Sequence, residues 1–214
     1  MLSKGELEQA LLTRFPAGMV EKLASAKVAV AGLGGLGSHI AVMLARSGIG
    51  QLLLVDFDRV DITNLNRQAY FIPHLGQYKT DALQHMLQEI NPYLVVTTEC
   101  VRVTEENAAE IFGAYPIVCE AFDRPENKAM LISTLLSQCP AMKIVSGSGM
   151  AGYGDCNQIQ TRKKMSRLYV CGDGVTGLES SVGLMAPRVA VCAGHQANQV
   201  LRLILENEGS NDLG

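Results

Sequence analysis

The glycine-rich segment between residues 32 and 37 constrains the fold more than any other feature of the chain. Residues 27–32, KVAVAG, predict a short buried strand that runs directly into Gly32, Gly34 and Gly37, and residues 35–48 carry the apolar spacing of a helix. A G-x-G-x-x-G pattern in this position lets backbone N–H groups and the helix N-terminus approach a phosphate group. The alternative is a tight turn that only allows the strand and the helix to pack.

Strand and helix patterns alternate along most of the chain. Apolar runs predict further strands at 51–56, 93–101, 116–123 and from 141. Amphipathic or apolar runs predict helices at 6–13, 78–91, 104–112 (capped by Thr104), 125–139 and 186–207. Residues 156–170 predict a hairpin or a strand-loop-strand unit. This order is typical of an α/β fold, a Rossmann-like, mainly parallel sheet with helices on both faces.

Composition favours one soluble domain. The 214 residues suit a single domain, 1–214, with 1–26 as an N-terminal helical segment and 208–214 as a disordered tail. A net charge of −3 argues against nucleic acid as a partner. The N-terminus lacks a signal-peptide pattern, and no apolar run reaches the roughly 18 residues of a membrane span. We therefore expect a cytoplasmic protein without membrane association.

The six cysteines are widely spread and form no C-x-x-C pair. This spacing argues against a structural zinc site built from paired thiolates, so no zinc is expected. In a cytoplasmic chain the default is free, mostly buried thiols. Cys100, Cys119 and Cys192 fall within apolar patterns and are predicted to lie in the core.

A polar run follows the second predicted strand. Asp56 ends that strand at the usual position of a ribose-binding carboxylate, and TNLNRQ at 63–68 then supplies amides and a guanidinium. Lys79 adds a second cation, and Asp123, at the end of another predicted strand, could hold Mg²⁺. Right-handed crossovers place the C-terminal ends of parallel strands at one edge, where these groups should meet. Taken singly, they could equally be surface cations and a helix cap.

This combination favours phosphoryl or nucleotidyl transfer over hydride transfer, because cations and a metal-binding carboxylate would surround one phosphate site. A P-loop is excluded, since G-x-x-x-x-G-K-[ST] is absent. An NAD-binding dehydrogenase or a nucleotide-binding regulatory module remains the alternative from another class.

Four segments together resemble a known family. They are GLGGLGS (32–38), DFDRVDITNLNRQ (56–68), GQYK (76–79) and EAFDRPENK (120–128). They resemble the ubiquitin-activating-enzyme superfamily, and within it the ThiF adenylyltransferases of sulfur-carrier proteins. The resemblance covers most of residues 27–205. The run GLMAPRVAVCAGHQAN (183–198) and the short length resemble the compact branch of this family, which lacks zinc cysteines.

The resemblance implies a reaction. ATP and Mg²⁺ bind at the sheet edge, the C-terminal glycine carboxylate of the carrier protein ThiS attacks the α-phosphate, and an acyl-adenylate forms as pyrophosphate leaves, a step of thiamine thiazole biosynthesis. Arg67, Lys79 and Asp123 would be catalytic, with Asp123 binding Mg²⁺. The implied ATP-binding set is Gly34, Gly35, Asp56, Asp58, Asn64, Arg67, Gln68, Lys79 and Asp123. A carboxylate is ionised at pH 7, so alignment and charge neutralisation can suffice without a general base.

Two further residues are candidates by resemblance. Arg14 is the candidate for an arginine that larger members donate to the neighbouring subunit's site. Cys171 is the candidate for a cysteine that forms an acyl or persulfide link to the carrier, and the cations at 162–164 and 167 could lower its pKa. The alternative is a loop cysteine without a role.

Two expectations concern partners. The same ATP site could activate another carboxylate, on a molybdopterin-type carrier or on a threonylcarbamoyl group of tRNA, although the acidic charge argues against tRNA. We also expect a homodimer, because family members dimerise and the 186–207 helix is more apolar than one exposed face permits.

Overall fold

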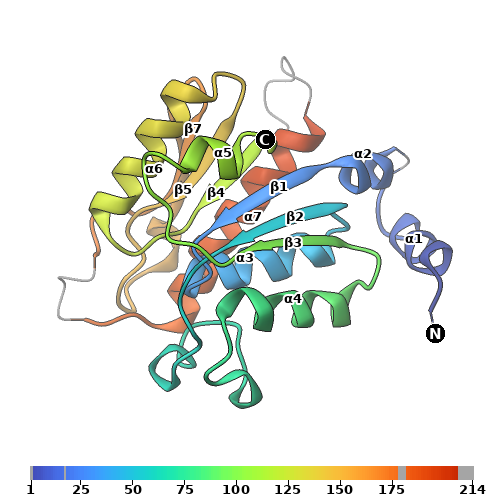
Figure 1. Cartoon of the computed structure of the whole chain (residues 1–214), viewed down its shortest axis with the longest axis horizontal. Helices are drawn as coiled ribbons and strands as arrows, with labels where there is room; N and C mark the ends of the chain where they lie inside the picture. Colours follow the sequence, from blue (N-terminus) through green and yellow to red (C-terminus); the bar gives the residue numbers. More distant parts are fainter. Residues whose placement is uncertain (1, 17, 178–181, 207–214) are drawn as a thin grey trace.

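The computed structural model describes residues 2–16, 18–177 and 182–206, and one seven-stranded sheet forms its centre (Figure 1). The strand order is β3-β2-β1-β4-β5-β7-β6. The strands are β1 Lys27–Ala31, β2 Gln51–Val55, β3 Val95–Glu99, β4 Ile117–Glu120, β5 Lys143–Gly147, β6 Gln160–Met165 and β7 Leu168–Gly172. All neighbours pair in parallel except β6 and β7. The predicted Rossmann-like, mainly parallel α/β fold is confirmed.

Helices cover both faces of this sheet. They are α1 Lys4–Leu12, α2 Met19–Ser25, α3 Gly35–Arg46, α4 Lys79–Ile90, α5 Ala108–Phe112, α6 Pro125–Gln138 and α7 Ala186–Leu205, with 3-10 turns η1 Ile62–Asn64, η2 Ile72–His74 and η3 Cys156–Gln158. Along β1, Val28 and Val30 pack into the core under α3, α4 and α7, whereas Ala29 and Ala31 pack into the core under α5 and α6. The central strand is apolar throughout because each of its faces is covered by helices.

The turn from β1 into α3 requires glycine at two positions. Gly32 has a φ of +88°, and a Cβ there would lie 2.9 Å from the Ala121 carbonyl oxygen. A Cβ on Gly37 would lie 1.8 Å from the Gly32 carbonyl oxygen. The absence of side chains therefore allows α3 to begin directly at the end of β1, next to the end of β4.

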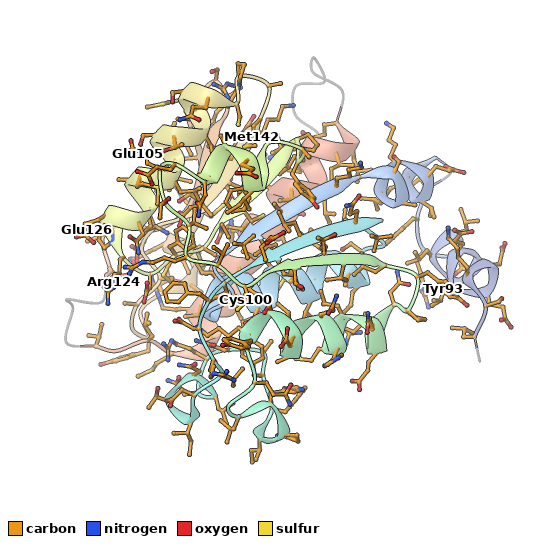
Figure 2. All side chains as sticks on the ribbon, in the orientation of Figure 1. Tyr93, Cys100, Glu105, Arg124, Glu126 and Met142 are labelled. Carbon is orange, nitrogen blue, oxygen red and sulfur yellow. The ribbon has the colours of Figure 1, made fainter. Side chains whose placement is uncertain are left out.

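Three local expectations are corrected by the structure. The helix predicted from residue 104 begins only at Ala108, with Asn107 rather than Thr104 as its N-cap. The strand predicted over 116–123 ends at Glu120, so Asp123 lies in the turn before α6. Cys100 is exposed after the last residue of the edge strand β3 and is not a core residue (Figure 2). The tail predicted at 208–214 lies outside the described residues.

Helix α7 packs its apolar side within its own chain. Val189, Cys192 and Val200 are buried in the core shared with α3 and the sheet. The apolar character of this helix is thus used inside the chain and does not by itself point to a second subunit, so the homodimer stays a prediction. Within the described residues, no helix has the length and hydropathy needed to cross a membrane.

Candidate nucleotide-binding site

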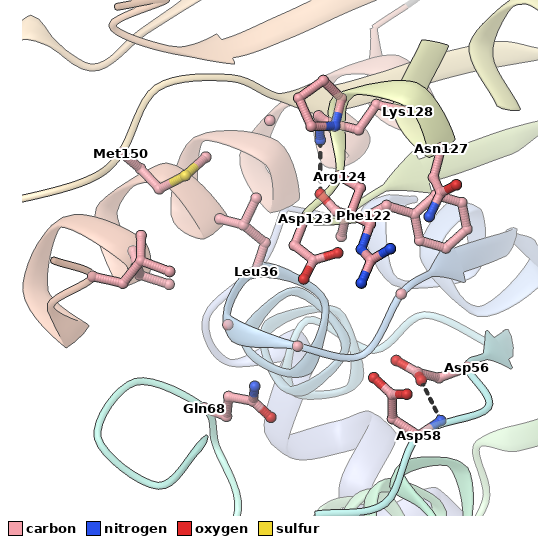
Figure 3. Close-up of a pocket in the computed structure, with 18 of the residues that line it drawn as sticks. Leu36, Asp56, Asp58, Gln68, Phe122, Asp123, Arg124, Asn127, Lys128 and Met150 are labelled. Carbon is pink, nitrogen blue, oxygen red and sulfur yellow. Dashed lines mark hydrogen bonds between the residues drawn. The ribbon is translucent and has the colours of Figure 1, made fainter. Parts of the chain in front are cut away.

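A cavity of about 930 Å³ opens at the C-terminal edge of the parallel strands. Its walls are the glycine-rich loop, the segments that follow β2, β4 and β5, residues 175–177 and the start of α7 (Figure 3). Every residue of the ATP-binding set named from the sequence lines this cavity. The structure therefore brings together the glycine-rich loop and side chains from three further segments of the chain, as the parallel topology requires.

Asp56 links the glycine-rich loop to the end of β2. One carboxylate oxygen accepts the Leu33 N–H at 2.7 Å, and the other accepts the Asp58 N–H at 2.8 Å. Burial raises the pKa of Asp56, and the nearby Lys79 ammonium opposes that rise. The carboxylate lies at the cavity wall, where it can still accept a ribose hydroxyl on its free lone pairs.

Lys79, the first residue of α4, lines the cavity beside Asp56 and Asp58. Its ammonium lies 2.9 Å from Asp58 Oδ2 and 3.9 Å from Asp56 Oδ2, and the side chain is nearly buried. The Asp58 side chain is about half exposed, at 52%. An anionic ligand in the cavity can therefore compete with Asp58 for this ammonium, because an exposed carboxylate is stabilised by water when it is released.

The segment that carries Arg67 is fixed against the first turn of α3. The Arg67 carbonyl oxygen lies 3.1 Å from His39 Nε2, and the Ser38 hydroxyl accepts the Ala69 N–H at 3.1 Å. The Arg67 guanidinium donates to the Thr63 carbonyl and to Asn66 Oδ1 on an exposed stretch. Both acceptors belong to the same loop, so the cation stays next to the cavity that it lines.

Gln68 adds an unused acceptor to this side of the cavity. Its side chain is buried, and its Oε1 has no hydrogen-bond partner in the described part of the chain. A buried amide oxygen without a partner is costly, so a donor on a bound ligand would satisfy it. Asn64, in contrast, uses its Oδ1 to accept the Asp61 N–H.

Asp123 lies on the opposite side of the glycine-rich loop, in the turn after β4, and its carboxylate is exposed to the cavity. Among the described residues, no group of three or more His, Cys, Asp or Glu side chains could hold a metal ion. A single carboxylate does fit Mg²⁺, which usually takes one or two protein carboxylates together with substrate phosphates and water. Such an ion would have to be shared with a bound nucleotide.

Two residues that line this wall, Arg124 and Lys128, and one buried behind it, Glu120, were missed from the sequence. Glu120, the last residue of β4, is fully buried and forms an ion pair with Lys128 of α6 at 2.8 Å. Arg124 and Lys128 both line the cavity. A glutamate within an apolar strand was the signal that could have pointed to this pair, because a buried carboxylate requires a partner.

Cys171 does not fit its predicted role. It is buried at the end of β7, does not line the cavity, and burial raises the pKa of its thiol to about 11. The expectation that nearby cations lower this pKa is wrong. Arg162, Lys163 and Lys164 are exposed on β6, where Arg162 donates to the Gly172 carbonyl and the Lys163 ammonium lies 5.7 Å from the centre of the Tyr169 ring. Arg167 donates to three backbone carbonyls.

Arg14 does not line this cavity either. It is exposed just after α1, and α1 and α2 lie beyond the N-terminal end of β1, away from the glycine-rich loop (Figure 1). Its donation to a second subunit remains a prediction.

Comparisons with known proteins agree with this architecture. The model of the ThiF family matches residues 7–213. A molybdopterin-synthase adenylyltransferase from Haemophilus influenzae is 30% identical over 195 residues, which cover 87% of this chain and 77% of that protein. The adenylyltransferase and sulfurtransferase MOCS3 from Culex quinquefasciatus is 30% identical over 203 residues, and the match spans 88% of this chain but only 44% of that relative.

Among solved structures, the tRNA N6-threonylcarbamoyladenosine dehydratase of Escherichia coli in complex with ATP superposes with a TM-score of 0.85. The two chains are 23% identical, and the match covers 96% of this chain and 97% of the other. At this identity the likeness shows the fold. The family match over nearly the whole sequence carries the assignment, and the chain belongs to the ThiF family.

Proposed function

We propose that this protein is an ATP-dependent adenylyltransferase that activates the C-terminal glycine carboxylate of the ubiquitin-like sulfur carrier ThiS. The observation that carries the proposal is the single cavity that joins the glycine-rich loop, Asp56, Arg67, Lys79 and Asp123. The curated relatives are named adenylyltransferases, which supports the same class of reaction here.

The residues of the cavity divide into two groups by chemistry. Charged side chains gather around the glycine-rich loop and after β2 and β4, where the nucleotide would bind. On the side of β5 and α7, the described residues that line the walls are 147–151, 175–177, Leu184 and Val189, and none of these is ionisable. Three of them are glycines, and an uncharged wall with glycines leaves room for an extended glycine-rich tail.

In the proposed reaction, the backbone N–H groups at the start of α3 bind phosphate and Asp56 accepts a ribose hydroxyl. Arg67 and Lys79 neutralise the charge that grows on the phosphates as the carrier's carboxylate forms a bond to the α-phosphorus and the bond to the pyrophosphate oxygen breaks. Asp123 would hold Mg²⁺, which supplies further charge neutralisation when bound. No side chain has to remove a proton, because the attacking carboxylate is already ionised.

The test is ATP–pyrophosphate exchange with purified ThiS. Wild type should exchange label only when ThiS is present, and Arg67→Ala and Asp123→Ala should each lower the rate by roughly a hundred-fold or more. Lys164→Ala, which removes an exposed cation outside this cavity, is the matched control. If both site variants exchange as fast as wild type, the assigned residues are not the catalytic ones.

The choice of acceptor is tested in parallel. The Haemophilus relative is named for molybdopterin synthase, so a molybdopterin-type carrier is the second candidate. Exchange measured side by side with ThiS, with that carrier and with tRNA identifies the acceptor. Tight NAD(H) binding together with indifference to ATP and Mg²⁺ would contradict adenylylation altogether. Sedimentation tests the proposed homodimer.

A further inference from the structure

One cation in the cavity is not engaged by any residue that the structure describes. Five cationic side chains line the walls, and four of them have partners: Arg67 donates within its loop, Lys79 is paired with Asp58, Lys128 is paired with Glu120, and the Arg102 guanidinium lies 5.7 Å from the centre of the Phe57 ring. Within the described residues, the Arg124 guanidinium makes no hydrogen bond or ion pair. It points from its turn toward the glycine-rich loop (Figure 3).

Hydrogen bonds and an ion pair from Glu120 and Lys128 fix the turn that carries Arg124. The buried Glu120 carboxylate accepts the Phe122 N–H at 2.7 Å and the Ser146 hydroxyl at 2.6 Å. Lys128 donates to Glu120 Oε1 at 3.1 Å and to the Phe122 carbonyl at 3.0 Å, and its ammonium lies 2.8 Å from Glu120 Oε2. These contacts fix both backbone groups of Phe122. They also pair the charge of Lys128 with the Glu120 carboxylate.

The Arg124 side chain does not stabilise α6, the helix that follows it. It is the N-cap residue of α6, yet its side chain makes no capping hydrogen bond. Serine, threonine, aspartate or asparagine is favoured at this position, and a cation is unfavourable near the positive end of the helix dipole. The residue therefore costs the helix some stability, and in the described part of the chain no hydrogen-bond or ion-pair partner compensates for this cost.

We infer that Arg124 binds the phosphate chain of the nucleotide, an inference that rests on the proposed function. In the strand order, β1 lies between β2 and β4, so the loop after β1 has Asp56 and Lys79 on one side and Asp123 and Arg124 on the other. Phosphates bound at the start of α3 would thus meet a cation from each side. A planar guanidinium can donate two parallel hydrogen bonds to one phosphate group, which suits an uncommitted arginine on a fixed turn.

Calorimetric titration of the full chain with ATP, pyrophosphate and adenosine tests this inference. In Arg124→Ala, the dissociation constants for ATP and pyrophosphate should rise by roughly ten- to a hundred-fold, because a charge-assisted hydrogen bond is lost, while adenosine should bind as in wild type. Arg124→Lys should recover part of the loss. Lys163→Ala is the matched control, since it removes the same charge from the exposed strand β6.

Arg124→Ser separates ligand binding from folding. Serine is a better N-cap than arginine, so this variant should keep or raise the Tm while losing affinity for ATP and pyrophosphate as Arg124→Ala does. Unchanged affinities in Arg124→Ala would overturn the inference. So would an unchanged ATP affinity combined with a raised KM for the carrier, because the guanidinium would then bind the acceptor's carboxylate.

The outcome is distinguishable from a failure of the proposed function. If wild type binds ATP but no carrier supports exchange, the adenylylation proposal fails, and the titrations still decide the role of Arg124. Wild type that binds neither ATP nor pyrophosphate would overturn both.

Discussion

The guanidinium of Arg188 and the carboxylate of Asp173 form an ion pair in which both side chains are almost fully buried, at 2% and 6% exposure. Asp173 also accepts the N–H groups of Val175 and Thr176, and Arg188 donates to the Asp155 carbonyl. The first turn of α7 is thus tied to the segment after β7, which forms part of the cavity wall.

Replacing Arg188 should be strongly destabilising. Arg188→Met leaves the Asp173 carboxylate buried without its partner, and we expect the free energy of unfolding to fall by about 3–5 kcal/mol. Urea denaturation measures this. Lys4→Met breaks the exposed Lys4–Glu8 pair and should cost less than about 1 kcal/mol. A similar small change in both variants would mean that the buried pair contributes little.

Gly37 should tolerate no side chain. Gly37→Ala places a Cβ 1.8 Å from the Gly32 carbonyl oxygen, so the turn under the phosphate site has to open, at an expected cost of about 3 kcal/mol or more. In Gly5→Ala the added Cβ meets nothing within 4 Å on helix α1, and stability should stay equal or rise by about 0.5–1 kcal/mol. Chemical denaturation of the two variants gives the comparison, and equal stabilities would contradict the close contact.

Asp56 should make folding less favourable as the pH rises. Burial raises its folded-state pKa above the ordinary value of 3.8, so the folded chain holds this proton more tightly than the unfolded chain. Below 3.8 both states are protonated; as the pH climbs from there through the raised pKa, wild type should lose stability relative to Asp56→Asn. Denaturation at a series of pH values measures the difference.

Asp61 provides a control of opposite sign. Hydrogen bonds from Thr63 lower the pKa of its exposed carboxyl, so wild type should instead gain stability relative to Asp61→Asn as the pH rises toward 3.8. If the stability difference between wild type and variant changed with pH in the same direction at both sites, burial could not be the cause at Asp56.

The thiols should differ sharply in reactivity. Burial raises the pKa of Cys171 to about 11 and that of Cys192 to about 12, whereas Cys100 is exposed. Because the thiolate is the reactive form, iodoacetamide at pH 8 should modify Cys100 first and leave Cys171 and Cys192 intact until the protein is unfolded in urea. Mass spectrometry of the native and unfolded samples locates the label. Labelling of native Cys171 as fast as Cys100 would restore it as a candidate nucleophile.

Most of the fold could be predicted because its signals are local. The apolar runs of β1, β2 and β4 mark strands that are covered on both faces, and the glycines at 32 and 37 mark a turn that only glycine can make. The predictions were wrong where the start of a helix or the burial of a residue depends on contacts outside the local sequence. Thr104 is a good capping residue, but the helix begins later, with Asn107 at the N-cap position. Cys100 follows the edge strand β3 and is exposed, although the sequence around it is apolar.

For the candidate site, too, one part could be predicted from the sequence and another part could not. Parallel strand order alone placed Asp56, Lys79 and Asp123 at one edge of the sheet, because every strand of a right-handed βαβ series ends on the same side. The sequence by itself thus determined the fold class and the family, and it predicted the edge of the sheet at which the candidate site lies. Only the tertiary structure decided which charges are available there: Lys128 forms an ion pair with Glu120, whereas Arg124 has no hydrogen-bond or ion-pair partner among the described residues. The physical reason is that burial and ion pairing depend on distances between segments that are far apart in the chain, which no local pattern encodes.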